Sequence, residues 1–166
     1  MKRRHLLMGG VAAAGLGACA PQTKFRTYNG PEVTYIVVNK EARSMYLLHQ
    51  DKVFKKYLID LGFAPIGDKF FEGDGRTPEG NYIIDRRNPK SQFHLSLGIS
   101  YPNARDRAEA AAIGKPPGGA IFIHGESNPF KRKRSDWTWG CIAVPNREME
   151  DVYAMVRNGT PIQINP

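Results

Sequence analysis

The chain has 166 residues, enough for one domain. Its hydrophobic fraction of 41% and charged fraction of 24% are those of an ordinary folded protein. This composition excludes a disordered chain and a membrane-spanning protein. The formal charge is +8; without Lys2, Arg3 and Arg4 it is +5, with 21 basic against 16 acidic residues. Such a surface suits an anionic polymer, but no aromatic–basic recognition pattern accompanies it, so we expect no nucleic-acid partner.

The first 18 residues have the organisation of an export signal. The basic stretch MKRRHLL precedes the apolar run LLMGGVAAAGLGA, which is too short to span a membrane. The run ends in LGAC, which resembles a bacterial lipoprotein signal with Cys19 as the lipidated first residue of the mature protein, and the arginine pair also resembles a twin-arginine signal. An ordinary secretory signal is the alternative. We therefore expect an exported, periplasmic protein, lipid-anchored at the outer membrane because Ala20, not aspartate, follows the cysteine.

The rest of the chain has the pattern of a tethered, mainly β domain. Residues 19–31 are polar and contain Pro and Gly, so we expect a tether there and one domain over 32–166. Runs of β-branched, aromatic and aliphatic residues between polar turns predict strands, and glycine-terminated periodic segments predict helices. The expected strands lie within 33–39, 43–50, 53–62, 81–85, 91–101, 118–125 and 160–165, and the expected helices within 105–114 and 146–159, the latter with Asn146 as N-cap. The fold class is therefore mainly β with a few helices (α+β).

Within the stretch 91–101, apolar and polar residues alternate from Phe93 on, with Phe93, Leu95, Leu97 and Ile99 on one side. This alternation predicts a strand with one buried face and one polar face. The polar face is expected to carry His94, Ser96, Gly98 and Ser100. His94 could line a cleft there, or it could be an ordinary surface histidine.

One histidine and one cysteine form a candidate catalytic pair. His124 ends the apolar run GGAIFIH, and Cys141 follows Gly140 in TWGCIAV. If Cys19 is lipidated, Cys141 has no disulfide partner and remains a thiol outside the cytoplasm. An imidazole can take the proton of a nearby thiol, and the backbone N–H groups of Gly140 and Cys141 could hold the oxyanion that follows attack on a carbonyl. The alternative is a pair of unrelated buried residues.

Three further segments lie in order along the chain with this pair. They are GDGRTPEG at 73–80, LGISYPN at 97–103, and IFIHG followed by DWTWGCIAV at 121–125 and 136–144. Together they resemble the L,D-transpeptidase (YkuD-type) catalytic domain family of bacterial cell-wall enzymes, from about Val33 to the C-terminus. The segment DWTWGCIAV is similar to that of one subgroup in particular.

The resemblance implies a β-sandwich with a catalytic cleft and a cysteine acyltransferase that acts on peptidoglycan stem peptides without a cofactor. Cys141 would attack the carbonyl of the third stem residue and expel D-alanine, and His124 would move the proton. An amine from a neighbouring stem or from a wall-linked lipoprotein would then resolve the thioester. With water as the acceptor, the same fold would be a hydrolase that cleaves cross-links or detaches a lipoprotein. A third alternative is a non-catalytic wall-binding lipoprotein.

Two positions depart from the family pattern. Many members have histidine where this chain has Trp139, and Arg or Asn where it has Ala143. These differences leave the Cys–His chemistry intact and bear on the choice between amine and water. Trp139 is expected to pack in the turn and could form a wall of the cleft.

The remaining candidates concern substrate binding. Arg76, in the family-like loop, could bind a substrate carboxylate or stabilise its own loop. His94, Ser100 and Tyr101 are the other candidates, together with Trp139. No paired-ligand spacing supports a metal site formed by His94, His124 and Cys141. The run KRKR at 131–134 is either a solvated charge cluster or a lid that attracts carboxylates.

Overall fold

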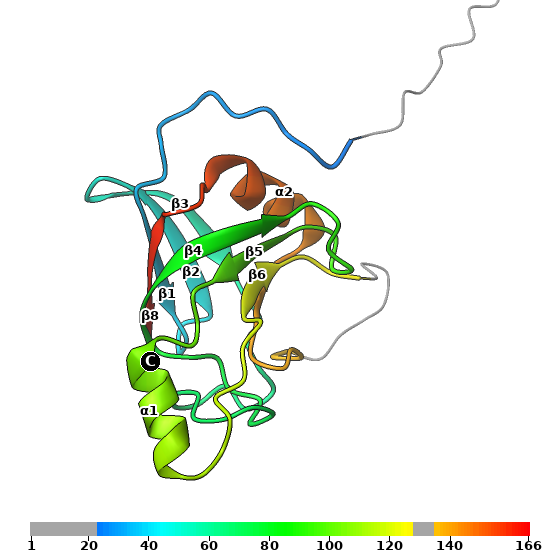
Figure 1. The fold of residues 1–166 in the computed structure, drawn as a ribbon. Coiled ribbons are helices and arrows are strands. Elements are labelled where there is room, and N and C mark those ends of the chain that lie inside the picture. The colour runs from blue at the N-terminus through cyan, green and yellow to red at the C-terminus, as the bar shows by residue number, and fades with distance from the viewer. Residues whose placement is uncertain (1–22, 128–134) are drawn as a thin grey trace, which may run out of the picture.

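The computed structural model describes residues 23–127 and 135–166 and has a mainly β fold (Figure 1). Across these residues one curled sheet of eight strands runs in the order β3-β2-β1-β8-β4-β5-β6-β7. The pairs β1–β8 and β6–β7 are parallel, and the other neighbours are antiparallel. The strands are β1 (Tyr35–Asn39), β2 (Ser44–His49), β3 (Lys52–Leu58), β4 (Gly80–Asn88), β5 (Ser96–Ile99), β6 (Phe122–His124), β7 (Ile142–Ala143) and β8 (Pro161–Asn165), and the helices are α1 (Ala104–Ala112) and α2 (Asn146–Met155). The expected fold class is confirmed.

The core forms on the concave side of the curled sheet. Strands β1 and β8 bury every second side chain, as the period of two along a strand requires, and β2 buries Met45 and Leu47 opposite β1. α2 closes this side with four buried residues. The inward residues of the three strands are Ile36, Val38, Met45, Leu47, Ile162 and Ile164, and those of α2 are Met149, Val152, Tyr153 and Met155.

The strand expected over 91–101 is shorter than predicted. β5 begins only at Ser96, because His94 has φ +69° and the alternation breaks there. The His94 ring leaves the sheet and its Nε2 lies 2.9 Å from the Glu150 carboxylate on α2. The prediction that His94 shares a strand face with Ser96 was wrong, since a left-handed residue turns its side chain out of register.

The start of α2 also differs from the prediction. Asn146 is the first helical residue, not the N-cap, and Pro145 occupies the cap position without a side-chain bond. The Asn146 side-chain oxygen instead accepts a hydrogen bond from the Glu126 N–H at 2.6 Å. This contact joins α2 to the segment that follows His124.

The described part of the expected tether lies against the domain. Residues 23–31 form no helix or strand, but the Arg26 guanidinium contacts Glu150 at 2.8 Å and Asp151 at 2.7 Å on α2. Cys19 and the signal segment lie outside the described residues, as does KRKR at 131–134, so those predictions remain predictions. None of the helices in 23–127 and 135–166 has the length and apolarity that crossing a membrane requires.

The loop between β3 and β4 is organised around a buried ion pair. Lys69 Nζ lies 2.7 Å from the Asp74 carboxylate, and the two side chains are only 3% and 5% exposed. Burial works against the charge of Asp74, but Lys69 and the backbone N–H groups of Arg76, Phe70 and Phe71 outweigh it and hold the pKa of the carboxyl below its ordinary value. The pair fixes the segment GDGRTPEG in one conformation.

Asp74→Asn is therefore expected to lower the free energy of unfolding by on the order of 3 kcal/mol at neutral pH, because it leaves the Lys69 charge buried without its partner. A carboxyl with a depressed folded-state pKa contributes stability above its unfolded pKa of about 3.9 and loses it as the pH falls below that value. Urea denaturation at pH 7 and pH 3 should thus show a larger difference between variant and wild type at pH 7 than at pH 3. Asp51→Asn, in the exposed β2–β3 turn, is the control, and equal effects of the two variants would contradict the account.

Candidate active site

Two rows of residues cross the last four strands on one face of the sheet. Since side chains two residues apart on a strand point to the same side, the rows share that face. The first row, from β4 to β7, consists of Asn88, Ser96, His124 and Ala143, and the second consists of Arg86, Gly98 and Phe122. Cys141 directly precedes β7, whose Ile142 pairs with Ile123 of β6. The cysteine therefore continues the second row beside Phe122.

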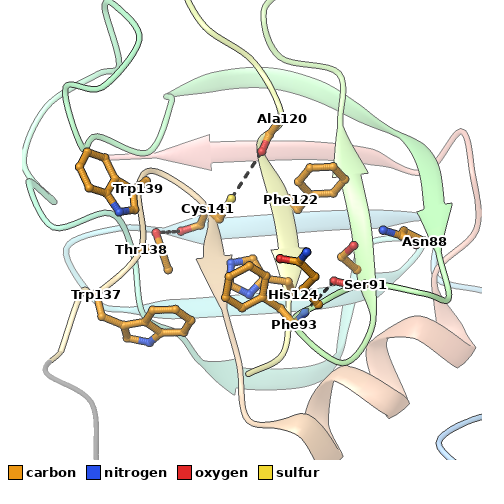
Figure 2. A pocket seen from close by; sticks show the side chains of 12 residues that line it. Asn88, Ser91, Phe93, Ala120, Phe122, His124, Trp137, Thr138, Trp139 and Cys141 are labelled. Atoms are coloured by element: carbon orange, nitrogen blue, oxygen red, sulfur yellow. Dashed lines mark hydrogen bonds between the residues drawn. The ribbon is translucent and has the colours of Figure 1, made fainter. Parts of the chain in front are cut away.

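A cavity of about 510 Å³ opens over these two rows, and both His124 and Cys141 line it (Figure 2). A second cavity of about 370 Å³ lies on the other side of Cys141, between the loop that holds Lys69 and the segment 118–121. Trp139 lines both cavities and is 73% exposed. Cys141 therefore lines two cavities.

The turn that presents the cysteine is built by Thr138 and Gly140. The Thr138 hydroxyl donates to the Cys141 carbonyl at 2.7 Å and accepts from the Gly140 N–H at 3.1 Å. Gly140 has φ +119°, and a Cβ there would lie 2.6 Å from the Arg76 carbonyl oxygen. Only glycine fits this position. Because the Gly140 N–H is already used, it is not available for an oxyanion, and of the two expected donors only the Cys141 N–H remains.

The Cys141 side chain is half-buried, and its Sγ lies 3.6 Å from the Ala120 carbonyl. Burial raises the pKa of the thiol above its ordinary value, while the Phe122 N–H and the charge of Lys69 act in the opposite direction without cancelling it. The resting sulfur is therefore a protonated thiol at neutral pH and needs a base to become a nucleophile.

His124 lines the same cavity as Cys141 and is the candidate for that base. Its ring is only 4% exposed, and its Nδ1 lies 2.7 Å from the Gly125 carbonyl oxygen. A carbonyl can only accept, so this contact assigns the proton to Nδ1 and leaves Nε2 as the accepting nitrogen of the neutral ring. The ring also packs against Phe93 at 4.6 Å and Trp137 at 5.6 Å between centroids, which fixes its orientation.

Asp60 contacts both the strand that follows Cys141 and the Trp137 ring that packs on His124. The sequence did not predict this role. The Asp60 backbone N–H and carbonyl pair with Ala143 at 2.9 and 2.8 Å, and its carboxylate accepts from the Trp137 indole N–H at 3.1 Å. Trp137 in turn packs edge-on against His124. The only sequence signal was one acid at the end of the apolar run 53–62, which does not distinguish a buried anchor from a surface residue.

Four of the expected substrate-binding residues lie outside the lining of the larger cavity. Arg76 donates to the Asp68 carbonyl and stacks on Phe70, and its backbone supports Gly140. Tyr101 is buried and donates to a backbone carbonyl, and the Ser100 hydroxyl accepts from the β4 backbone. His94, described above, is engaged by α2. These four side chains hold the scaffold, whereas Trp139 is at the cavity.

The order of these elements matches a known family. The model of the L,D-transpeptidase catalytic domain (YkuD) matches residues 33–164, most of the chain. The chain belongs to the L,D-transpeptidase catalytic domain family. The matched range contains every residue of the two cavities, and the family is the one that the three sequence segments had indicated.

Relatives and solved structures agree with this assignment. The chain is 28% identical to YafK of Escherichia coli K12 over 128 residues, 74% of this chain and 46% of that protein. It is 27% identical to YkuD of Bacillus licheniformis over 161 residues, 96% of this chain and 81% of that protein. The crystal structure of the helical cell shape determining protein Pgp2 from Campylobacter jejuni superimposes with a TM-score of 0.63 at 27% identity, over 87% of this chain and 51% of that one. The chain thus spans about half the length of YafK and of Pgp2.

No group of three or more His, Cys, Asp or Glu side chains able to hold a metal ion is present among residues 23–127 and 135–166. The site assembled in this L,D-transpeptidase domain consists of a thiol, an imidazole and backbone groups. That set of groups is sufficient for nucleophilic acyl chemistry.

Gly140→Ala tests whether the close backbone approach holds the cysteine turn. The added methyl meets the Arg76 carbonyl and an unfavourable φ, so we expect a lower melting temperature and a displaced turn. Gly114→Ala is a matched control, because Gly114 also has a positive φ, +68°, but open space around it. Thermal unfolding should show a clearly larger loss for Gly140→Ala, and similar losses would contradict a packing role.

Proposed function

We propose that this protein modifies peptidoglycan as a cysteine acyltransferase that forms a thioester between Cys141 and a stem peptide. The observation that carries the proposal is the pairing of Cys141 and His124 in one cavity, with the His124 tautomer set by the Gly125 carbonyl. Membership of the L,D-transpeptidase family and the similarity to YafK and Pgp2 support the substrate class.

The first half-reaction makes the thioester. His124 Nε2 takes the thiol proton, and the sulfur attacks the carbonyl carbon of the third stem residue. The Cys141 N–H, which donates to no described residue, stabilises the negative oxygen of the tetrahedral intermediate. The C–N bond then breaks, His124 returns the proton to the leaving amine, and D-alanine departs.

The second half-reaction uses the same groups in reverse. An acceptor enters on the His124 side of the sulfur, gives its proton to Nε2 and attacks the thioester carbonyl, and the thiol is regenerated. If the acceptor is an amine from a second stem or a wall-linked lipoprotein, the product is a new cross-link. If it is water, the product is a shortened stem, and a bond to another stem or to a lipoprotein is cleaved.

Purified sacculi distinguish these outcomes. After incubation with the protein, mass spectrometry of the released muropeptides should show new dimers for transfer, and monomers or freed lipoprotein for hydrolysis. Cys141→Ala should abolish either product, and His124→Ala should reduce it by about 10²–10⁴-fold because general-base assistance is lost. His49→Ala is the control, because His49 is a half-buried histidine at the end of β2 and lines neither cavity. Unchanged muropeptides with wild-type protein would favour a non-catalytic wall-binding role and contradict the proposal.

We further propose that the protein is exported and anchored to the outer membrane through Cys19. The LGAC sequence and the basic and apolar stretches before it support this location. Cys19→Ala is expected to move the protein from the membrane fraction to the soluble fraction of the periplasm and to remove the mass of the acyl chains. A membrane fraction unaffected by the substitution would contradict lipidation at this residue.

A further inference from the structure

A β-bulge in β4 places an acidic and a basic side chain next to each other on the strand that carries Asn88, a residue of the larger cavity. The pairing with β5 passes from Ile84–Ile99 directly to Arg86–Gly98, so Asp85 is the extra residue. Asp85 and Arg86 are consecutive, yet their side chains meet, with Arg86 Nη1 at 2.8 Å from the Asp85 carboxylate. Without the bulge, neighbouring residues of a strand would point to opposite faces.

Gly98 gives the Arg86 side chain its path across the sheet. A Cβ at Gly98 would lie 2.4 Å from Arg86 Cγ, 2.7 Å from Arg86 Nε and 2.7 Å from the Asp85 carboxylate. Because Gly98 lies in regular β5, this glycine provides space rather than an unusual backbone angle. Arg86 therefore lies flat over β5 and reaches toward β6.

Phe122 joins this arginine to the reacting sulfur. The Arg86 guanidinium lies 4.8 Å from the centre of the Phe122 ring, which lines the larger cavity together with Cys141 (Figure 2). The Phe122 backbone N–H acts on the Cys141 sulfur from the other side of the same residue. Phe122 thus contacts Arg86 through its ring and Cys141 through its backbone, so that one residue separates the guanidinium from the sulfur.

Arg86 also has the free donors that an anion needs. Its side chain is 45% exposed, and within the described residues its hydrogen bonds all leave from Nη1 toward Asp85, so Nε and Nη2 are open. Among residues 23–127 and 135–166, no Lys or Arg lines the larger cavity, and Lys69 in the smaller cavity is paired with Asp74. A two-pronged Nε and Nη2 edge matches a carboxylate.

We propose that Arg86 binds the free carboxylate of the residue on the amine side of the scissile bond, so that the site selects a C-terminal residue as the leaving group. This inference rests on the proposed function. His124 must protonate the leaving amine, so the leaving residue occupies the cavity that holds His124. Phe122 lines that cavity, and the Arg86 guanidinium lies on the Phe122 ring. The carboxylate of such a residue lies one residue from the attacked carbonyl, about 3.5 Å along the chain.

Two synthetic tetrapeptide stems test the assignment, one ending in D-alanine and the other in D-alanine carboxamide. Release of the last residue, followed by mass spectrometry, should show kcat/KM about 10–100-fold higher for the carboxylate with wild-type protein, as expected for a charge-assisted hydrogen bond. Arg86→Gln should remove most of this preference, and Arg86→Lys should retain part of it because the charge remains but the fork is lost. Gly98→Ala should act like Arg86→Gln, because the new methyl displaces the arginine.

Arg157→Gln, an exposed arginine beside Glu32, is the control and should keep the full preference. Equal turnover of the two peptides by wild-type protein, or an equal loss on both peptides in Arg86→Gln, would overturn the role of Arg86 while leaving the proposed function in place. Release from neither peptide by folded wild-type protein would overturn the proposed function itself, and the assignment of Arg86 with it.

Discussion

Three backbone segments meet at Gly140 without any side chain between them. A Cβ at Gly140 would lie 2.6 Å from the Arg76 carbonyl, and a Cβ at Gly62 would lie 2.0 Å from the Gly75 carbonyl and 3.0 Å from Gly140 Cα. Gly62 also donates its N–H to the Thr77 hydroxyl at 3.1 Å. The loop of residues 70–80 is thus the support on which the cysteine turn rests, which explains why the segment GDGRTPEG accompanies TWGCIAV in one fold.

The same packing determines the chemistry of the sulfur. A turn pressed against the sheet buries part of Cys141, and burial raises the pKa of its thiol. A thiol with a raised pKa needs a base to become a nucleophile, and His124 is the imidazole in the same cavity. His124 can serve because its Nδ1 is bound by the Gly125 carbonyl, and Trp137, itself held by Asp60, keeps the ring in place. The scaffold and the protonation chemistry are parts of one arrangement.

Sequence patterns predicted the structure where residues close together in the chain determine it. Runs of β-branched, aromatic and aliphatic residues predicted strands where β1 and β2 lie, and short motifs around His124 and Cys141 indicated the family. The patterns failed where a single backbone angle or a distant contact decides the outcome. A left-handed φ at His94 ended the strand early, and the Gly140 N–H is taken by Thr138.

The roles of Asp60 and Arg86 depend on tertiary contacts and on a bulge, neither of which leaves a periodic trace in the sequence. Arg76 is the opposite case. A family-like motif pointed to the loop of Arg76, but it did not show that the Arg76 backbone carbonyl, rather than the guanidinium, contacts the cysteine turn at Gly140.

The rate of Cys141 alkylation by iodoacetamide as a function of pH tests the central claim most directly. The native protein should be labelled at Cys141, as located by the mass of the modified peptide. His124→Ala should slow labelling near neutral pH and move the rise in rate to higher pH. His49→Ala should do neither. A native thiol that reacts only after unfolding, or a pH profile that is the same with and without the His124 imidazole, would contradict a nucleophile activated by that residue.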